Sequence, residues 1–222
     1  LGWFNRYVSE AEGGNRQVLA DAYNRIGDCY FYVRNFDAAR QHYDKAGQVD
    51  ASLGDYSLYQ EGFVKGLQRD YMGKIQSLNR LITDYPQSSY IDDALYEQGR
   101  AFVMLEDNAN AIGRYQVLLD KFPQSHMARR AANEIGLLYY QDDKYPEAIA
   151  AYKRVIQNYP GSEEAQLAQR DLKSIYIDLN QVDEYAAFAS AIPGGVNFDV
   201  NERDSLTYVA AERVYMRGEA AE

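Results

Sequence analysis

The sequence predicts an all-α fold, a superhelix of antiparallel helix pairs stacked along one direction. Glycine recurs at an interval of 37 residues, at Gly62, Gly99 and Gly136. Proline recurs at the same interval, 24 residues after each glycine, at Pro86, Pro123 and Pro160. Stacked identical units repeat one helix contact and one chain break in this way, because each unit packs on its neighbours rather than on a shared core.

The residues between glycine and proline indicate that each unit is a pair of helices. In the unit of Gly136, Ala148 follows 12 residues later and Tyr152 follows 16 residues later. Gly27 and Gly99 are followed by alanine and tyrosine at the same offsets. Small residues at the glycine and alanine positions let two helices approach closely, and proline stops the second helix because it cannot continue the hydrogen-bond ladder.

Five helix pairs are expected along the chain. The first helices of the pairs are expected near 20–33, 55–69, 89–105, 126–141 and 163–179. The second helices are expected near 36–50, 73–85, 109–122, 146–159 and 182–190. A serine two residues after each proline is expected to cap the next first helix, at Ser88, Ser125 and Ser162.

The same spacing divides the chain into a single array of repeats. The complete repeats are expected at 20–54, 55–91, 92–128, 129–165 and 166–196. Partial repeats are expected at 1–13, as a second helix without its partner, and at 205–222, as a first helix without its partner. Half-repeats at both ends predict that the chain is a segment of a longer array.

Two repeats depart from the pattern. In repeat 55–91, Lys65 and Lys74 stand where an aromatic residue and an alanine are expected, and this repeat is predicted to be the softest. In repeat 166–196, Lys173 and Tyr185 stand where glycine and alanine are expected. Larger residues at these two positions predict that the helix pair splays.

Composition limits the partners that the chain can bind. The 222 residues carry a formal net charge of −10, which disfavours binding to nucleic acid and to an anionic membrane surface. The sequence contains no run of the roughly 18 apolar residues that a membrane helix needs, so direct membrane insertion is not expected. Cys29 is the only cysteine, which excludes an intrachain disulfide.

The sequence also lacks a catalytic or metal-binding pattern. His42 and His126 are the only histidines, and neither has a neighbour at metal-ligand spacing. Acidic pairs such as Asp92-Asp93 are adjacent on a helix, so their side chains diverge and do not form an acid–base pair. We therefore expect no enzyme activity, no catalytic residues, no cofactor and no metal.

The whole chain resembles the tetratricopeptide repeat proteins. The segments Tyr85-Pro86-Gln87-Ser88 and Ala94–Arg100 resemble repeats of bacterial cell-envelope proteins, such as the TolA-binding protein of the Tol-Pal system and the outer-membrane assembly lipoprotein. The segments at 181–185 and 197–204 resemble those of long Bacteroidetes repeat proteins. The resemblance implies a protein–protein interaction scaffold in the periplasm or at the outer membrane, with a role in assembly or maintenance of the cell envelope.

The resemblance also implies where a partner protein or peptide binds. Positions two, five, nine and twelve of each first helix would line a concave groove. The residues at these positions that we predict to contact a partner are Asn24, Asp28, Phe31, Tyr56, Tyr59, Phe63, Tyr96, Arg100, Arg130, Asn133, Tyr140 and Arg170. Asp93 and Leu137 share the same face. The alternative is that these residues only pack against neighbouring first helices.

Two other functions remain open at this point. The chain could be a structural spacer or a segment that self-associates through its half-repeat ends. It could also be the repeat domain of a larger multidomain protein.

Overall fold

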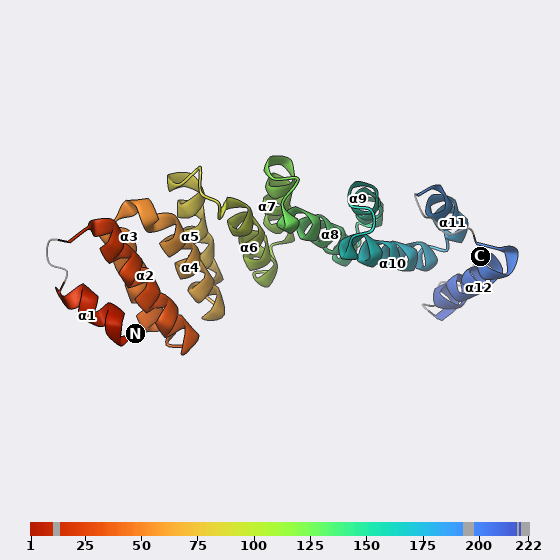
Figure 1. The fold of residues 1–222 in the computed structure, drawn as a ribbon. Helices are drawn as coiled ribbons and strands as arrows, with labels where there is room; N and C mark the ends of the chain where they lie inside the picture. The colour runs from red at the N-terminus through yellow and green to blue at the C-terminus, as the bar shows by residue number, and fades with distance from the viewer. Residues whose placement is uncertain (11–13, 193–197, 217, 219–222) are drawn as a thin grey trace. The chain divides into compact units, whose positions relative to one another are not determined.

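The computed structural model describes residues 1–10, 14–192, 198–216 and 218, and over these residues it is all-α, with no β-strand (Figure 1). The predicted fold class is therefore confirmed. The helices form two compact units, 1–122 and 123–222. Parts of three predicted repeats, at 11–13, 193–196, 217 and 219–222, lie outside the described residues.

The first unit consists of helix pairs that stack on one another. Its elements are α1 (Gly2–Glu10), α2 (Arg16–Tyr32), α3 (Phe36–Val49), the 3₁₀ turn η1 (Ala51–Leu53), α4 (Gly54–Leu67), α5 (Tyr71–Asp84), α6 (Ile91–Met104) and α7 (Asn108–Lys121). The helices α2 and α3, α4 and α5, and α6 and α7 pack as pairs, and each pair contacts the next through α3 with α4 and α5 with α6.

The second unit repeats the arrangement with one looser pair. Its elements are α8 (His126–Gln141), α9 (Tyr145–Asn158), α10 (Glu163–Asp178), α11 (Val182–Ala191) and α12 (Val200–Met216). The helix α10 packs extensively against α9 and also contacts α8, whereas its contact with α11 is smaller. Tyr185, which stands in the alanine position of this pair and was expected to splay it, is buried.

Side-chain caps decide where several helices begin. Ser125 and Ser162 cap α8 and α10 as predicted, accepting from the backbone N–H groups of Met127 and Ala165 at 3.1 Å each. The prediction for Ser88 is wrong, because Tyr90 occupies the N-cap position of α6 and Ser88 donates to Asp55 at 2.7 Å. Helix α6 therefore begins two residues later than the expected residue 89.

The turn inside each helix pair has the same backbone geometry. The residue before each second-helix cap has a positive φ, at Arg34, Arg69, Glu106, Asp143 and Asn180, with values between 54° and 64°. In the third pair, Glu106 N–H donates to the Val103 carbonyl and Asp107 N–H donates to the Phe102 carbonyl. This is the Schellman arrangement, which closes the end of the first helix.

The recurring spacing of glycine and tyrosine has a steric cause. A Cβ placed on Gly136 would lie 2.7 Å from the ring of Tyr152, and one placed on Gly99 would lie 2.3 Å from the ring of Tyr115. Both tyrosines are at most 1% exposed. The glycine in the first helix therefore makes room for an aromatic ring from the second helix of the same pair.

The two lysines of repeat 55–91 are held by partners. The Lys74 ammonium is buried and pairs with the Glu97 carboxylate across α5 and α6. Lys65 lies 2.7 Å from Glu61 and donates to Ser77 at 2.9 Å. Removing one partner of a buried ion pair leaves an uncompensated charge, so the Lys74–Glu97 pair ties α5 to α6.

Among the described residues, no helix is both long and apolar enough to pass through a bilayer.

Candidate functional site

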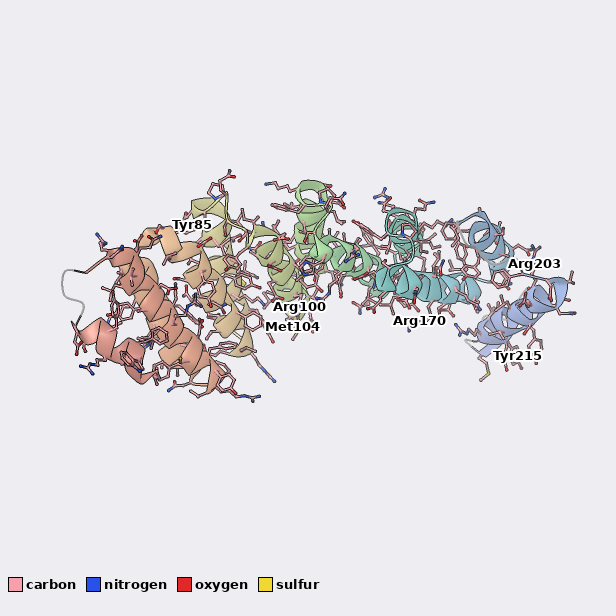
Figure 2. All side chains as sticks on the ribbon, in the orientation of Figure 1. Tyr85, Arg100, Met104, Arg170, Arg203 and Tyr215 are labelled. Carbon is pink, nitrogen blue, oxygen red and sulfur yellow. The ribbon has the colours of Figure 1, made fainter. Side chains whose placement is uncertain are left out.

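A pocket of about 410 Å³ lies between α8 and α10 in the second unit. This volume falls within the roughly 300–1,000 Å³ that is typical of ligand pockets. The helix α8 contributes Asn133, Leu137 and Tyr140, α9 contributes Tyr152, and α10 contributes Leu167, Arg170, Asp171, Ser174 and Ile175. Figure 2 labels Arg170 on α10.

Helical spacing brings these side chains to one place. On α8, Asn133, Leu137 and Tyr140 are separated by four and three residues, so they lie on one face of the helix. On α10, Leu167 and Ser174 are seven residues apart and lie on the face that meets α8. The pocket is therefore the space between two successive first helices.

One wall of the pocket is apolar and accessible. Leu167 is 41% exposed, and Leu137 is half-buried. Ile175 is buried beneath them at 1% exposure. An accessible leucine beside a concave surface lets an incoming apolar group bury area without any rearrangement of the core.

The charged groups at the pocket are paired with one another. Arg170 Nε lies 3.3 Å from Asp171 Oδ1. On the same side, Arg213 donates to Asp178 at 2.7 Å and lies 3.4 Å from Ser174 Oγ. Because these pairs are largely solvent-exposed, they hold side-chain positions more than they add to stability.

The pocket also contains two buried polar atoms for which the described residues supply no hydrogen-bond partner. They are the hydroxyl of Tyr152 and the Oδ1 atom of Asn133. Burial raises the pKa of the Tyr152 phenol, and the negative charges of Asp171 and Glu134 raise it further. The hydroxyl therefore stays protonated at neutral pH and remains able to donate.

In the first repeat, the tyrosine equivalent to Tyr152 has a hydrogen-bond acceptor for its hydroxyl. Tyr43 occupies the same position relative to Gly27 as Tyr152 does to Gly136, and its hydroxyl donates to Asp28 Oδ1 at 2.9 Å. Asp28 directly follows Gly27, whereas Leu137 directly follows Gly136. The leucine removes the acceptor, so the Tyr152 hydroxyl is left facing the residues of the pocket.

The structure brings three of the predicted contact residues together at this pocket, namely Asn133, Tyr140 and Arg170. Five more of its lining residues were not predicted, and two of them follow from the same register. Leu167 and Ser174 occupy positions two and nine of repeat 166–196, and a strict count from Gly136 would have found them. Asp171 and Tyr152 carry no sequence signal for a site, because a charged helix residue and a core tyrosine are common.

Two predicted contact residues in the first unit are corrected by the structure. Asn24 is 2% exposed and its side-chain oxygen accepts from Ser57 of α4 at 3.0 Å. Tyr96 is 3% exposed and packs against Tyr115, with 5.6 Å between ring centroids. Both side chains are covered by neighbouring helices, so neither is accessible to a partner.

Four other predicted residues of the first unit contact one another in two pairs. Tyr56 donates to Asp28 at 2.7 Å, and the ring of Phe31 lies 5.9 Å from that of Phe63. These four side chains therefore pack between successive first helices and are half-buried.

Three predicted residues remain at or near the surface. Tyr59 is half-buried and stacks on Tyr90 at 5.2 Å between centroids. Burial, with the charge of Asp93, raises the pKa of Tyr59 to about 12. Arg100 and Arg130 are exposed, and Arg100 pairs with Glu97 at 3.0 Å.

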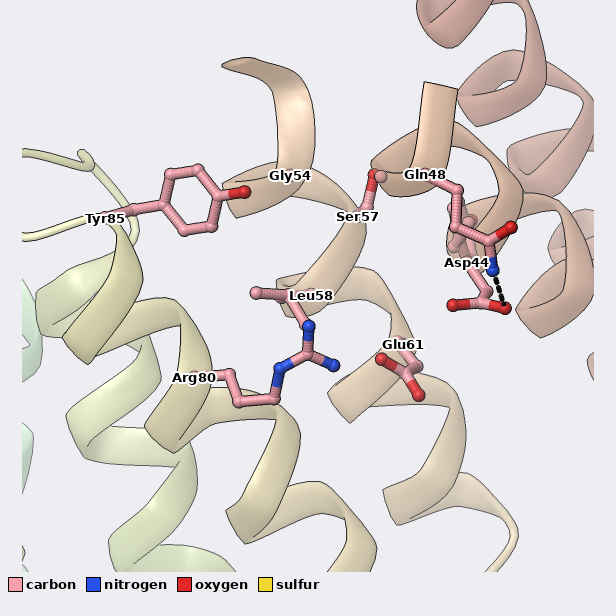
Figure 3. Close-up of a pocket in the computed structure, with 10 residues that line it drawn as sticks. Asp44, Gln48, Gly54, Ser57, Leu58, Glu61, Arg80 and Tyr85 are labelled. Carbon is pink, nitrogen blue, oxygen red and sulfur yellow. Dashed lines mark hydrogen bonds between the residues drawn. The ribbon is translucent and has the colours of Figure 1, made fainter. Parts of the chain in front are cut away.

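A smaller pocket in the first unit lies between α3, α4 and α5 (Figure 3). Its volume is about 120 Å³, and none of the predicted contact residues lines it. The Tyr85 hydroxyl reaches Gly54, where a Cβ would clash with it, and Gln48 donates to Asp44 at 2.8 Å. The space is below the size of a typical ligand pocket.

Family models identify the repeat. Three models, each described as tetratricopeptide repeat, match residues 20–55, 56–88 and 96–163, which together make up more than half of the chain. The chain belongs to the tetratricopeptide repeat proteins. No curated protein matches the chain in sequence.

Solved structures share the fold. The crystal structure of the MamA protein is 20% identical, with a TM-score of 0.61 over 91% of this chain and 96% of that one. YrrB, described as a tetratricopeptide repeat protein with an unusual peptide-binding site, is 16% identical, with a TM-score of 0.60 over 94% and 96%. A tetratricopeptide repeat protein from Parabacteroides merdae is 15% identical, with a TM-score of 0.61 over 91% and 80%.

Proposed function

We propose that this chain is a non-enzymatic scaffold that binds a peptide segment of a partner protein, and that the pocket between α8 and α10 holds part of that segment. The observation that carries the proposal is the pocket itself, where the accessible Leu167 adjoins two buried polar atoms for which the described part of the chain supplies no partner. Such a surface is completed by a ligand that brings both apolar area and hydrogen-bonding groups. The peptide-binding site described for YrrB, which has the same fold, supports a peptide as the ligand.

The proposal is tested by selecting peptides from a random library against the immobilised chain and measuring their affinity for two variants. Leu167→Glu places a charge on the apolar wall of the pocket. Val18→Glu makes the same change on α2, where Val18 is 48% exposed and lies outside the pocket. We expect Leu167→Glu to weaken binding of the selected peptides at least tenfold and Val18→Glu to leave it unchanged. Equal affinity for both variants would contradict the proposal.

We further propose that the chain works in the bacterial cell envelope, in the periplasm or at the outer membrane. The support is the resemblance of Tyr85-Pro86-Gln87-Ser88 and Ala94–Arg100 to repeats of envelope proteins. Fractionation of cells that express the native gene tests this location. Recovery in the periplasmic or outer-membrane fraction is expected, and recovery with cytosolic markers would contradict it.

Self-association is a second candidate function. It is favoured by large side chains that are exposed on α1 and α12, where Trp3 is 85%, Tyr208 71% and Tyr215 78% exposed. Sedimentation equilibrium over a wide concentration range distinguishes the two candidates. A mass that rises with concentration and is lowered by Trp3→Ser and Tyr215→Ser supports self-association, and a constant monomer mass excludes it.

A further inference from the structure

The polar atoms of the pocket between α8 and α10 specify the chemistry of a ligand. Tyr152 is 1% exposed, and its buried hydroxyl is a hydrogen-bond donor. Asn133 Oδ1 is a buried acceptor in the same pocket. Leaving a buried polar group without a partner costs more than an average hydrogen bond gains. A group that offers one acceptor and one donor at its tip has the hydrogen-bonding groups that match these two atoms.

We propose that this pocket recognises a primary carboxamide, the side chain of an asparagine or glutamine in the bound peptide. The carboxamide oxygen accepts from the Tyr152 hydroxyl, and its amino group donates to Asn133 Oδ1. The methylene groups of the same side chain pack on Leu137 and Leu167. This inference rests on the proposed peptide-binding function and assigns the residue type that the pocket selects.

Other side chains fit the pocket less well. A carboxylate has no proton for Asn133 Oδ1, and the cation of the pocket, Arg170, is already paired with Asp171. An ammonium group needs a counter-charge, and the Asp171 carboxylate is already paired with Arg170 at 3.3 Å. An apolar side chain leaves both buried atoms unsatisfied.

A main-chain amide has the same donor and acceptor as a carboxamide, but its position differs. It is bonded to the chain on both sides, whereas a side-chain carboxamide ends in a free tip. Because Tyr152 is 1% exposed, a tip reaches its hydroxyl more easily than a continuous backbone does. Probes that share one main chain and differ only in the side chain therefore distinguish a side-chain carboxamide from a main-chain amide.

The test is an NMR titration of the full chain with four blocked amino acids, each an N-acetyl N-methylamide. The glutamine probe carries the carboxamide, and the norleucine probe has the same main chain without it. The glutamate and lysine probes present a carboxylate and an ammonium group at similar reach. We expect the glutamine probe to bind at least fivefold more tightly than the other three, with shifts of the Asn133 side-chain amide.

Two variants assign the preference to the proposed atoms. Tyr152→Phe removes the donor without adding volume, and we expect it to reduce the preference for glutamine over norleucine to about twofold or less. Leu137→Asp places an acceptor where Asp28 stands in the first repeat, so it should satisfy the hydroxyl internally and have the same effect. A preference for glutamine that survives both variants would overturn the assignment.

The outcomes separate this inference from the proposed function. Equal binding of the glutamine and norleucine probes at the pocket would assign recognition to the main chain and overturn the carboxamide proposal, while peptide binding by the pocket stands. Tighter binding of the lysine or glutamate probe would overturn it in favour of a charged side chain. If the affinity of the library peptides is unchanged in Leu167→Glu, the proposed function itself is contradicted.

Discussion

At the residue scale, the repeats are set by pairs of side chains rather than by single residues. Gly27, Gly99 and Gly136 each face the tyrosine that follows by 16 residues, so neither position of such a pair is free to change alone. The position directly after the glycine then decides what the tyrosine hydroxyl bonds to. Asp28 accepts from Tyr43, whereas Leu137 leaves the Tyr152 hydroxyl to the pocket.

Replacing the frame glycine by alanine should destabilise the chain. In Gly136→Ala the new Cβ would lie 2.7 Å from the Tyr152 ring, so the ring or the helix must shift. We expect a loss of about 1–3 kcal/mol in the free energy of unfolding, as for other overpacked cores. Gly113→Ala is the control, because nothing lies within 4 Å of its Cβ on α7. That variant should gain about 0.5–1 kcal/mol, since glycine weakens a helix interior.

Urea denaturation of the two variants measures both effects. Equal stability of Gly136→Ala and Gly113→Ala would show that the tyrosine ring does not depend on the glycine.

Removing the hydroxyl from the two equivalent tyrosines should have different effects on stability. Tyr43→Phe loses a hydrogen bond to the carboxylate of Asp28 and should cost about 1–3 kcal/mol. Tyr152→Phe removes a buried hydroxyl that has no partner among the described residues, so the free energy of unfolding should stay within about 0.5 kcal/mol or rise. The same denaturation experiment compares them, and a larger loss in Tyr152→Phe would indicate that its hydroxyl is already satisfied.

At the element scale, the second helices begin at caps of unequal quality. Asn35, Asp70 and Asp107 each accept a hydrogen bond from the backbone at the start of α3, α5 and α7. Lys144 holds the corresponding position in front of α9, with no side-chain cap. Its φ of −87° and ψ of 66° are close to those of Asp70, at −82° and 72°. A capping side chain therefore fits the backbone that is already present.

Lys144→Asn should stabilise the second unit. An asparagine cap is worth about 0.5–2 kcal/mol over a residue that does not cap. The exposed ion pair between Lys144 and Asp142, at 3.1 Å, is lost and offsets little of this gain. Thermal unfolding monitored by circular dichroism should show a higher Tm for Lys144→Asn and a lower Tm for Asp107→Ala. An unchanged Tm in Lys144→Asn would show that the α9 terminus is satisfied in another way.

The elements were more predictable from the sequence than the site. The 37-residue interval predicts each helix pair, because glycine, alanine, tyrosine and proline act within one pair. The exposure of Asn24 and Tyr96 was not predictable, since it depends on Ser57 of the next repeat in one case and on Tyr115 of the following helix in the other. Asn133 has the same register position as both and still lines a pocket. Which first-helix residues stay accessible is thus decided by packing that the repeat pattern does not encode.

At the scale of the whole molecule, tyrosine is the main core-forming aromatic residue, with 21 in the chain. Burial raises the pKa of Tyr43, Tyr56, Tyr152 and Tyr185, and it raises that of Tyr59 to about 12. A raised pKa in the folded state favours the neutral phenol. The stability that each buried tyrosine contributes is therefore complete below its pKa in the unfolded chain, about 10. The contribution is lost as the pH rises from there through the folded pKa values.

The chain should therefore unfold cooperatively in alkali. Absorbance at 295 nm, which reports phenolate, should rise for these buried tyrosines together with the loss of helical circular dichroism above pH 10. Full ionisation of all tyrosines near pH 10 with the helices intact would contradict the burial that the structure assigns to them.

The pocket between α8 and α10 is proposed to receive a partner peptide. The most direct test of this proposal is NMR chemical-shift mapping of the full chain with a peptide selected from the library. We expect the largest shifts to fall on Asn133, Leu137, Leu167 and Arg170. Shifts confined to α2 and α4, around Asp28 and Phe63, with none at the pocket, would contradict it.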